Sequence, residues 1–421
     1  DASRRVCRVR VIYRCHYWSG TGIIFKNTGR ATVEEMFLGS RSLRMVPLAL
    51  STLSSIMSST VIIAFTAHFY AYGTHMGLTS LAVLLLIPVT TDVIIPALYR
   101  LKIMSIFEYL RARYNNKISI TSCVMYFLVT VIVNPYNLFY TVFQFPFLLG
   151  CLAIGLNLLH GSCKQALKIF GGLRGVVLTD SMQAVIAILA PTTIIMKILS
   201  DSHSGILKLR PLNDFNFGTF VIDTTLDFTK DENTWSCLIG VLAVHLYRSG
   251  MDQMIVQRYL AARTLEDAKR YSKEFLCADK LPNFCVGILL IYWFRDCDPQ
   301  LDQLLPFYVK KLLTKFPGFS GLFLSGVFSA AKSTISSIIN SQAAVIYTDV
   351  VSQLFTLSDL QAARVTRVLV FGTGSVITVY SAVIPFLGSV TRIIMMIQSA
   401  VTGPFVGLFL MAIIFPCVNS K

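Results

Sequence analysis

Charged residues are scarce in this chain: of its 421 residues, only 14% are charged, whereas 54% are hydrophobic. A soluble domain carries about 25% charged residues, so the composition argues against an ordinary soluble enzyme. Intrinsic disorder is excluded as well, because so apolar a chain has to bury its surface. The mean hydropathy of +0.64 therefore indicates a protein of the membrane.

Patterns for metal binding or catalysis are also missing. The ten cysteines include no Cys-x-x-Cys pair, which is the usual signature of a structural zinc site. No nucleophile and base stand in the arrangement that hydrolases use. We therefore expect neither an enzyme, a structural metal nor an organic cofactor. The chain also lacks an Asn-x-Ser/Thr sequon, so no glycosylation site helps to orient it.

The net charge is +15, which in a soluble protein would suggest a nucleic-acid partner. Here the basic residues stand between long uncharged runs, so we interpret them as anchors of cytoplasmic loops and expect no nucleic-acid partner. Segments 100–117 and 258–273 are rich in Arg and Lys, whereas segment 201–232 is rich in Asp and Glu. The positive-inside rule places the first two segments in the cytoplasm and the third outside.

Long apolar runs account for most of the chain. A helix that crosses a bilayer needs roughly 20 mostly apolar residues. Segments 45–91 and 118–163 contain no Asp, Glu, Lys or Arg, and each has room for two spans. Further runs of this kind follow at 176–199, 234–257, 281–294, 316–348, 368–391 and 393–415. Together they predict an all-α polytopic membrane protein with about ten spans.

Two of these runs carry small and hydroxylated residues at their centres. The segment from Ser54 to Val61 reads Ser-Ser-Ile-Met-Ser-Ser-Thr-Val. This pattern favours either close helix packing or an unwound helix whose freed carbonyls face an ion. Ala330, Ser333 and Thr334 share one helix face by their i, i+3, i+4 spacing. Two hydroxyls and a carbonyl suit Na⁺, a hard cation that prefers oxygen ligands, although such hydroxyls also bond the carbonyl four residues before them.

Seven further motifs follow one another along the chain, at Glu35–Leu43, Gly171–Asp180 with Gln183, Asp252–Arg263, Asp296–Pro299, Gln303–Tyr308, Ser333–Asn340 and Gly403–Phe409. By these motifs and their order, the chain from about Thr32 to Lys421 resembles the sodium/solute symporter family, whose members carry sugars, iodide, monocarboxylates or vitamins. The multivitamin and monocarboxylate branch fits better than the sugar branch.

The resemblance implies the LeuT-type fold, in which two inverted five-helix repeats hold binding sites near the middle of the membrane. Under this interpretation, residues 1–44 are a basic cytoplasmic tail and entry segment. Residues 45–199 form the first repeat, core helices 1–5, with the fourth helix abbreviated. Residues 200–232 are an extracellular loop, and residues 233–421 form the second repeat, core helices 6–10, with the family's later helices absent.

In this family the first helix of each repeat is broken, which here implies breaks near Ser54 and within His245–Gln253. The resemblance places the coupling ion, Na⁺, between the first break and a later helix. Asp180 matches the family's acidic residue on the inner sodium route, and a solvated acid near a helix start is the alternative. The implied sodium ligands are backbone carbonyls of Ser54, Met57 and Ala330 and the hydroxyls of Ser333 and Thr334.

The substrate cavity is implied to lie between the two breaks. Val61 replaces a polar residue of the sugar carriers, which argues against a hexose. A cation such as Arg248 is costly at membrane depth and usually functional, and a guanidinium suits a substrate carboxylate. Pairing with Asp252, or snorkelling to the inner surface, is the alternative. The residues implied to line or gate the cavity are Val61, His245, Tyr247, Arg248, Ser249 and Gln253.

The sequence therefore predicts a multi-pass plasma-membrane symporter that uses Na⁺ to move a small organic solute, such as a vitamin or monocarboxylate anion, within a lipid bilayer. Several stretches depart from the family pattern: Asp1–Gly20 is basic, 161–170 is abbreviated, 281–294 is short, and the chain ends at Lys421. These departures suggest a truncated or imperfect copy. The alternative is accordingly a non-transporting truncated membrane protein or a sodium-independent channel.

Overall fold

The structure is a computed structural model that describes residues 32–72, 75–133, 172–203, 234–278, 319–381 and 390–415, with a few single positions between them. In these ranges the regular elements are all helices, and an isolated bridge joins Leu43 to Ala262. Helices satisfy their own backbone hydrogen bonds, which is what a chain without water around it requires. The all-α class expected from the sequence is confirmed.

Six helices of the described ranges are long and apolar enough to cross a membrane, or seven if a bent pair counts as one span. This supports a multi-pass membrane protein. Residues 1–31 and 161–170, all but one residue of 281–294 and most of 200–232 lie outside the described residues. The six spans are 81–100, 116–133, 172–200, 321–354, 359–381 and 396–414.

The bent pair is the first broken helix. Helix α3 (Met45–Ile56) is followed after a short break by the π-helical turn η2 (Val61–Phe65) and by α4 (Thr66–Tyr72). The two halves are bent by 63°. The hydroxyl of Ser58 accepts a hydrogen bond from the backbone N–H of Val61 at 3.3 Å and so caps the second half. The break expected near Ser54 is confirmed.

A second break interrupts the chain at Asp252. The turn η6 (Ser236–Gly240), helix α13 (Leu242–Leu246) and turn η7 (Tyr247–Met251) precede it, and α14 (Gln253–Ala261) follows. Asp252 is extended, with φ −73° and ψ 120°, and its carboxylate accepts from the N–H of Met254 at 3.0 Å. Since this side chain starts a new helix, the break falls within the expected segment.

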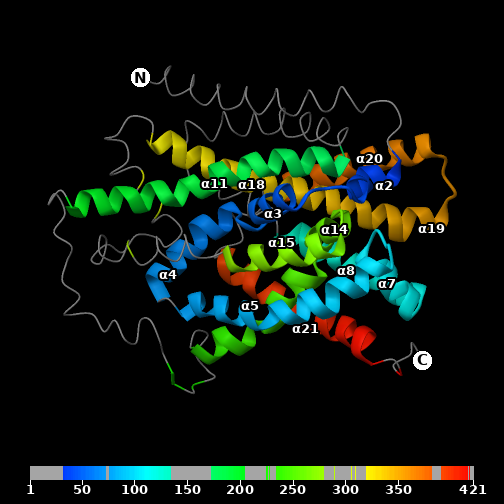
Figure 1. Cartoon of the computed structure of the whole chain (residues 1–421), viewed down its shortest axis with the longest axis horizontal. Coiled ribbons are helices and arrows are strands. Elements are labelled where there is room, and N and C mark those ends of the chain that lie inside the picture. Colours follow the sequence, from blue (N-terminus) through cyan, green and yellow to red (C-terminus); the bar gives the residue numbers. More distant parts are fainter. Residues whose placement is uncertain are drawn as a thin grey trace.

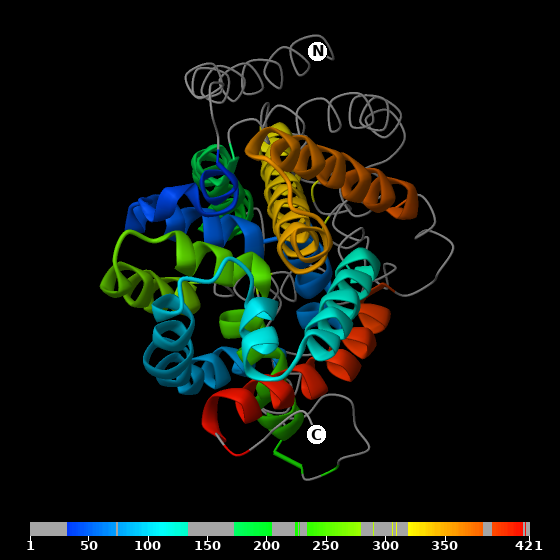
Figure 2. The same cartoon turned by 90° about the vertical axis from the view of Figure 1, so that its right-hand side faces the viewer.

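Helices α11 (Gly172–His203) and α18 (Phe319–Val345) pack side by side (Figure 1). Helix α3 packs against both of them. Small residues allow this close approach. A Cβ on Gly326 of α18 would overlap the Cβ of Ala190 on α11. Figure 2 shows α18 (gold) with α11 (green) on one side and α20 (orange) on the other.

The other described elements complete the core and its inner connections. They are α2 (Val33–Leu38), η1 (Gly39–Arg41), η3 (His75–Leu78), α5 (Thr79–Pro88), η4 (Val89–Ile94), α6 (Ile95–Arg100), α7 (Ile106–Arg113), α8 (Asn116–Val133), α15 (Leu265–Ala278), η10 (Ile346–Val351), α19 (Ser352–Leu354), α20 (Asp359–Ser381) and α21 (Val390–Ile414).

Helices α2, α7 and α19 lie at one end of the molecule in Figure 1, opposite α4, and basic residues belong to these elements or to the segments beside them. Arg41 donates to the carbonyl of Lys102 at 2.6 Å. Arg111 of α7 forms an ion pair with Asp349 of η10, with 3.1 Å between the nitrogen and the oxygen. The bridge at Leu43 places the start of α3 beside the end of α14 at this same end. We refer to it as the basic end.

Candidate functional site

The break after α3 leaves a backbone carbonyl without its usual helical partner. The N–H of Ser58 bonds the carbonyl of Ile56 at 2.7 Å rather than that of Ser54. The hydroxyl of Ser333, from α18, donates to the Ser54 carbonyl instead, at 2.5 Å. A helix end whose carbonyls are buried needs such partners, and here a distant helix supplies one.

A second hydroxyl of α18 makes the matching contact one residue along. Thr334 donates to the carbonyl of Ser55 at 2.9 Å and to the carbonyl of Ala330, on its own helix, at 3.0 Å. The intrahelical bond considered from the sequence is thus present together with the contact between helices. The hydroxyl of Ser54 lies 2.5 Å from that of Ser333.

The expected sodium ligands thus gather around the first break. Ser54, Met57, Ala330, Ser333 and Thr334 are all buried, with at most 1% of each residue exposed. Met57 is the residue that ends α3. Apart from the Met57 carbonyl, the expected ligand oxygens lie in two neighbouring hydrogen-bonded pairs, Ser333 with the Ser54 carbonyl and Thr334 with the Ala330 carbonyl. Oxygen ligands without thiols or imidazoles suit a hard cation.

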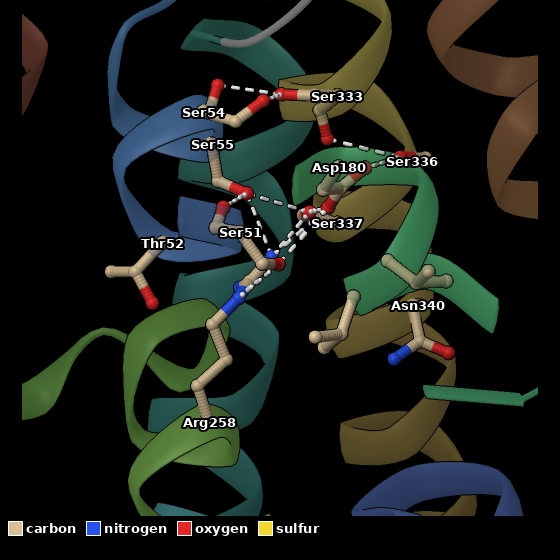
Figure 3. Close-up of polar contacts among 12 residues, drawn as sticks. Ser51, Thr52, Ser54, Ser55, Asp180, Arg258, Ser333, Ser336, Ser337 and Asn340 are labelled. Atoms are coloured by element: carbon tan, nitrogen blue, oxygen red, sulfur yellow. Dashed lines mark hydrogen bonds and ion pairs between the residues drawn. The ribbon is translucent and has the colours of Figure 1, made fainter. Parts of the chain in front are cut away.

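Asp180 lies beside this group and is not a solvated acid. It is fully buried, two turns into α11. Its carboxylate accepts from the hydroxyl of Ser337 at 3.0 Å and more distantly from those of Ser51 at 3.3 Å and Ser336 at 3.4 Å. The carboxylate therefore joins α11 to α3 and to α18 directly next to the expected sodium ligands (Figure 3).

The counter-ion of Asp180 is Arg258, which the loop-charge analysis assigned to a cytoplasmic basic segment. That assignment is wrong for this residue: Arg258 is 2% exposed and lies 3.3 Å from the Asp180 carboxylate. A buried acid requires a partner, so an Asp within an apolar span was itself a signal for a cation on another helix. No role was expected from the sequence for Ser51, Ser55, Ser336 and Ser337 either, although Ser51 lies one turn before Ser54, and Ser336 and Ser337 lie one turn after Ser333.

The residues expected to line the substrate cavity flank the two breaks. Val61 follows the first break and His245 precedes the second, and both are half-buried. The ring of Tyr247 stands edge-on to Phe405, with 5.4 Å between centroids. Ser249 is buried and its hydroxyl lies 3.2 Å from that of Thr90.

The amide of Gln253 is engaged with the loop before α7. Its nitrogen donates to the carbonyl of Met104 at 3.0 Å, and its oxygen accepts from the N–H of Ile106 at 2.9 Å. Both polar ends of the side chain are therefore used within the protein. In this structure, Gln253 joins the second break to the basic end.

Arg248 pairs with Asp252, which was the alternative considered from the sequence. The guanidinium lies 2.7 Å from the carboxylate, and the Arg248 side chain remains 31% exposed. Asp252 also accepts from the hydroxyl of Tyr126 at 3.0 Å. The pair holds the cation at the second break while part of its surface stays accessible.

Comparisons with known proteins agree with this architecture. Residues 36–421 match the family described as the sodium:solute symporter family. The human sodium-coupled monocarboxylate transporter 2 is 28% identical over 96% of this chain and 67% of its own length. The putative sodium-dependent multivitamin transporter of Drosophila melanogaster is 28% identical over 95% of this chain and 69% of its own length.

A solved structure shares the fold. It is the substrate-bound, outward-open state of a Na⁺-coupled sialic acid symporter, with a TM-score of 0.77 and 20% sequence identity. The likeness covers 97% of this chain and 88% of that one. At this identity it shows the fold alone, and it confirms the LeuT-type architecture expected from the sequence.

Proposed function

This chain belongs to the sodium:solute symporter family, and on that premise we propose that it carries a small organic solute across the plasma membrane together with Na⁺, by alternating access. Its family and its relatives are sodium-coupled transporters rather than enzymes. The single observation that carries the proposal for this chain is the group of buried oxygens at the first break.

We place Na⁺ among the carbonyls of Ser54, Met57 and Ala330 and the hydroxyls of Ser333 and Thr334. The hydroxyl protons of Ser333 and Thr334 now point at carbonyl oxygens. On sodium binding, these protons turn away, so that the hydroxyls and the carbonyls all present lone pairs to the ion. No side chain has to leave the site, which suits reversible binding of a weakly held cation.

Sodium at this place ties α3 to α18, which belong to the first repeat (45–199) and the second repeat (233–421) in our division of the chain. An ion shifts a conformational equilibrium only by its difference in affinity between the states. Ligands from two separately moving helices provide such a difference, because the ion is fully coordinated only when the helices are close. The membrane potential adds about 2.3 kcal/mol per charge per 100 mV.

For the solute we propose an organic anion, such as a vitamin or monocarboxylate. Val61 gives the first break an apolar side chain, and Arg248 gives the second break a partly exposed cation. A guanidinium binds a carboxylate by parallel hydrogen bonds. The names of the relatives, which refer to monocarboxylates and vitamins, support the same class.

The direct test is uptake of labelled lactate, biotin and pantothenate by cells that express the chain, in sodium medium and in choline medium. We expect uptake of at least one anion that requires sodium and saturates with it. Equal uptake in both media would favour a sodium-independent channel. No uptake above that of untransfected cells, with the protein present at the surface, would favour the non-transporting alternative.

A further inference from the structure

The cluster around Arg258 lies between the sodium ligands and the basic end. Ser51 stands one turn before Ser54 on α3, toward the bridge between Leu43 and Ala262. Ser337 stands one turn after Ser333 on α18, toward the ion pair of Arg111 and Asp349. A cation that moves from the sodium ligands toward the basic end therefore meets this cluster first.

We call the route from the sodium ligands to the basic end the passage. The guanidinium of Arg258 forms hydrogen bonds with the polar groups that line it. It donates to the hydroxyl of Ser51 at 3.0 Å, of Ser55 at 2.7 Å and of Ser337 at 2.6 Å, and to the Asp180 carboxylate at 3.3 Å. In Figure 3 the side chain extends from α14 into the space between α3, α11 and α18, just below Ser54 and Ser333.

This arrangement has two electrostatic consequences. The positive guanidinium repels a second cation strongly, because the surroundings are buried and of low dielectric constant. It also neutralises Asp180 and uses the serine hydroxyls, which would otherwise attract a sodium ion. The passage is thus closed by a charge of the same sign as the transported ion, and the ligands that could draw the ion inward are already taken.

We propose that Arg258 is the inner gate of the sodium route: its guanidinium must leave Asp180 and the serines before sodium passes to the basic end. The inference rests on the proposed function. Arg258 belongs to α14, directly after the second break, whereas its partners belong to α3, α11 and α18. Movement of α14 away from these helices withdraws the guanidinium and exposes the carboxylate, so the second broken helix controls release of the ion held at the first.

The test is the flux of ²²Na⁺ through proteoliposomes in the absence of organic solute. The double variant Arg258→Met with Asp180→Asn removes the gate and leaves no unpaired buried charge, which is the costly outcome of a single change. We expect at least a tenfold rise in this uncoupled flux. Arg258→Lys keeps the cation and should stay within threefold of the wild type.

The matched control removes the ion pair between α7 and η10, by Arg111→Met with Asp349→Asn. This pair lies outside the cluster around Arg258, and we expect the uncoupled flux of the variant to equal that of the wild type. If both double variants raise the flux equally, or neither does, the gate is refuted. A purely structural role for Arg258 predicts one of those two results.

A milder pair of variants covers the case in which the double variant does not fold. Ser337→Ala removes one partner of the guanidinium and should raise the flux severalfold. Ser341→Ala, whose buried hydroxyl bonds its own helix at the carbonyl of Ile338, should not. Equal flux in these two variants also refutes the gate. If the wild type shows no sodium-driven uptake at all, the proposed function fails instead, so the two failures are distinguishable.

Discussion

The hydroxyl of Ser333 donates a hydrogen bond to the backbone carbonyl of Ser54 at 2.5 Å, across 279 positions of the chain. A carbonyl that a helix break leaves without its helical partner thus accepts from a hydroxyl of α18, which belongs to the longest of the described spans. The pair joins two helices through groups that we propose as ligands for sodium. On that proposal, binding of the ion and packing of the helices depend on the same atoms.

Thr334→Val keeps the shape of the side chain and removes its oxygen, so the proposed sodium site loses one ligand. Hydrogen bonds and contacts to charged groups contribute about 1.5–3 kcal/mol, which corresponds to about ten- to hundredfold in affinity. We expect the sodium concentration for half-maximal uptake to rise by that factor, with surface expression unchanged. Thr334→Ser keeps the oxygen and should stay close to the wild type.

The control for this prediction is Ser375→Ala on α20, whose hydroxyl bonds the carbonyl of Phe371 within its own helix. It removes a hydroxyl of the same kind from an exposed position and should leave the sodium dependence unchanged. A Thr334→Val protein with the sodium dependence of the wild type would contradict the assignment of Thr334 as a ligand.

Arg248→Leu removes the cation at the second break. If Arg248 holds the substrate carboxylate, the KM for an organic anion rises at least tenfold, which corresponds to about 1.4 kcal/mol, while the sodium dependence stays the same. Competition uptake with a labelled anion measures this. Tyr126→Phe removes another partner of Asp252 but keeps the cation, and it should change the KM little. Equal KM values for wild type and Arg248→Leu would exclude the substrate role.

Gly326→Ala places a methyl group on Ala190 of α11. Overpacking of this kind costs about 1–3 kcal/mol, so we expect a lower midpoint of thermal unfolding in detergent. Gly372→Ala on α20 is the matched control, because its methyl group would meet no atom within 4 Å. Identical midpoints for the two variants would show that α11 and α18 approach less closely than described.

The pair of Arg111 and Asp349 gives a prediction about stability. Asp349 is fully buried, and the Arg111 side chain is 20% exposed. Removal of one partner of a buried pair costs about 3–5 kcal/mol, so Arg111→Met alone should lower the unfolding midpoint clearly. Combining it with Asp349→Asn should recover most of the loss. A double variant no more stable than the single one would indicate that the pair is not what holds α7 to η10.

The described spans and the first break have a local cause in the sequence, whereas the second break could be predicted only through the family resemblance. Apolar length predicts a span, and crowding of Ser54 with other hydroxylated residues, read beside the family's pattern, predicts a break. The partners across the break were predictable only through the family resemblance, since nothing local connects Ser54 with Ser333.

Arg258 shows the limit of such reasoning. Counting charge along the chain places it with the loop residues that follow it, because the count ignores which side of a helix a residue occupies. Arg258 is buried against Asp180, which belongs to α11, and against serines that belong to α3 and α18. Gln253 is similar: the family resemblance placed it at the cavity, whereas its amide is used by the loop at Met104 and Ile106. Long-range polar pairing of this kind has no local sequence signal.

The most direct test of the account is equilibrium binding of ²²Na⁺ to the purified protein, compared between the wild type and the double variant Ser333→Ala with Thr334→Ala. The account predicts saturable binding to the wild type, loss of binding in the double variant, and unchanged binding to Ser375→Ala. Equal binding to the wild type and the double variant, with both proteins folded, would contradict a sodium site between α3 and α18.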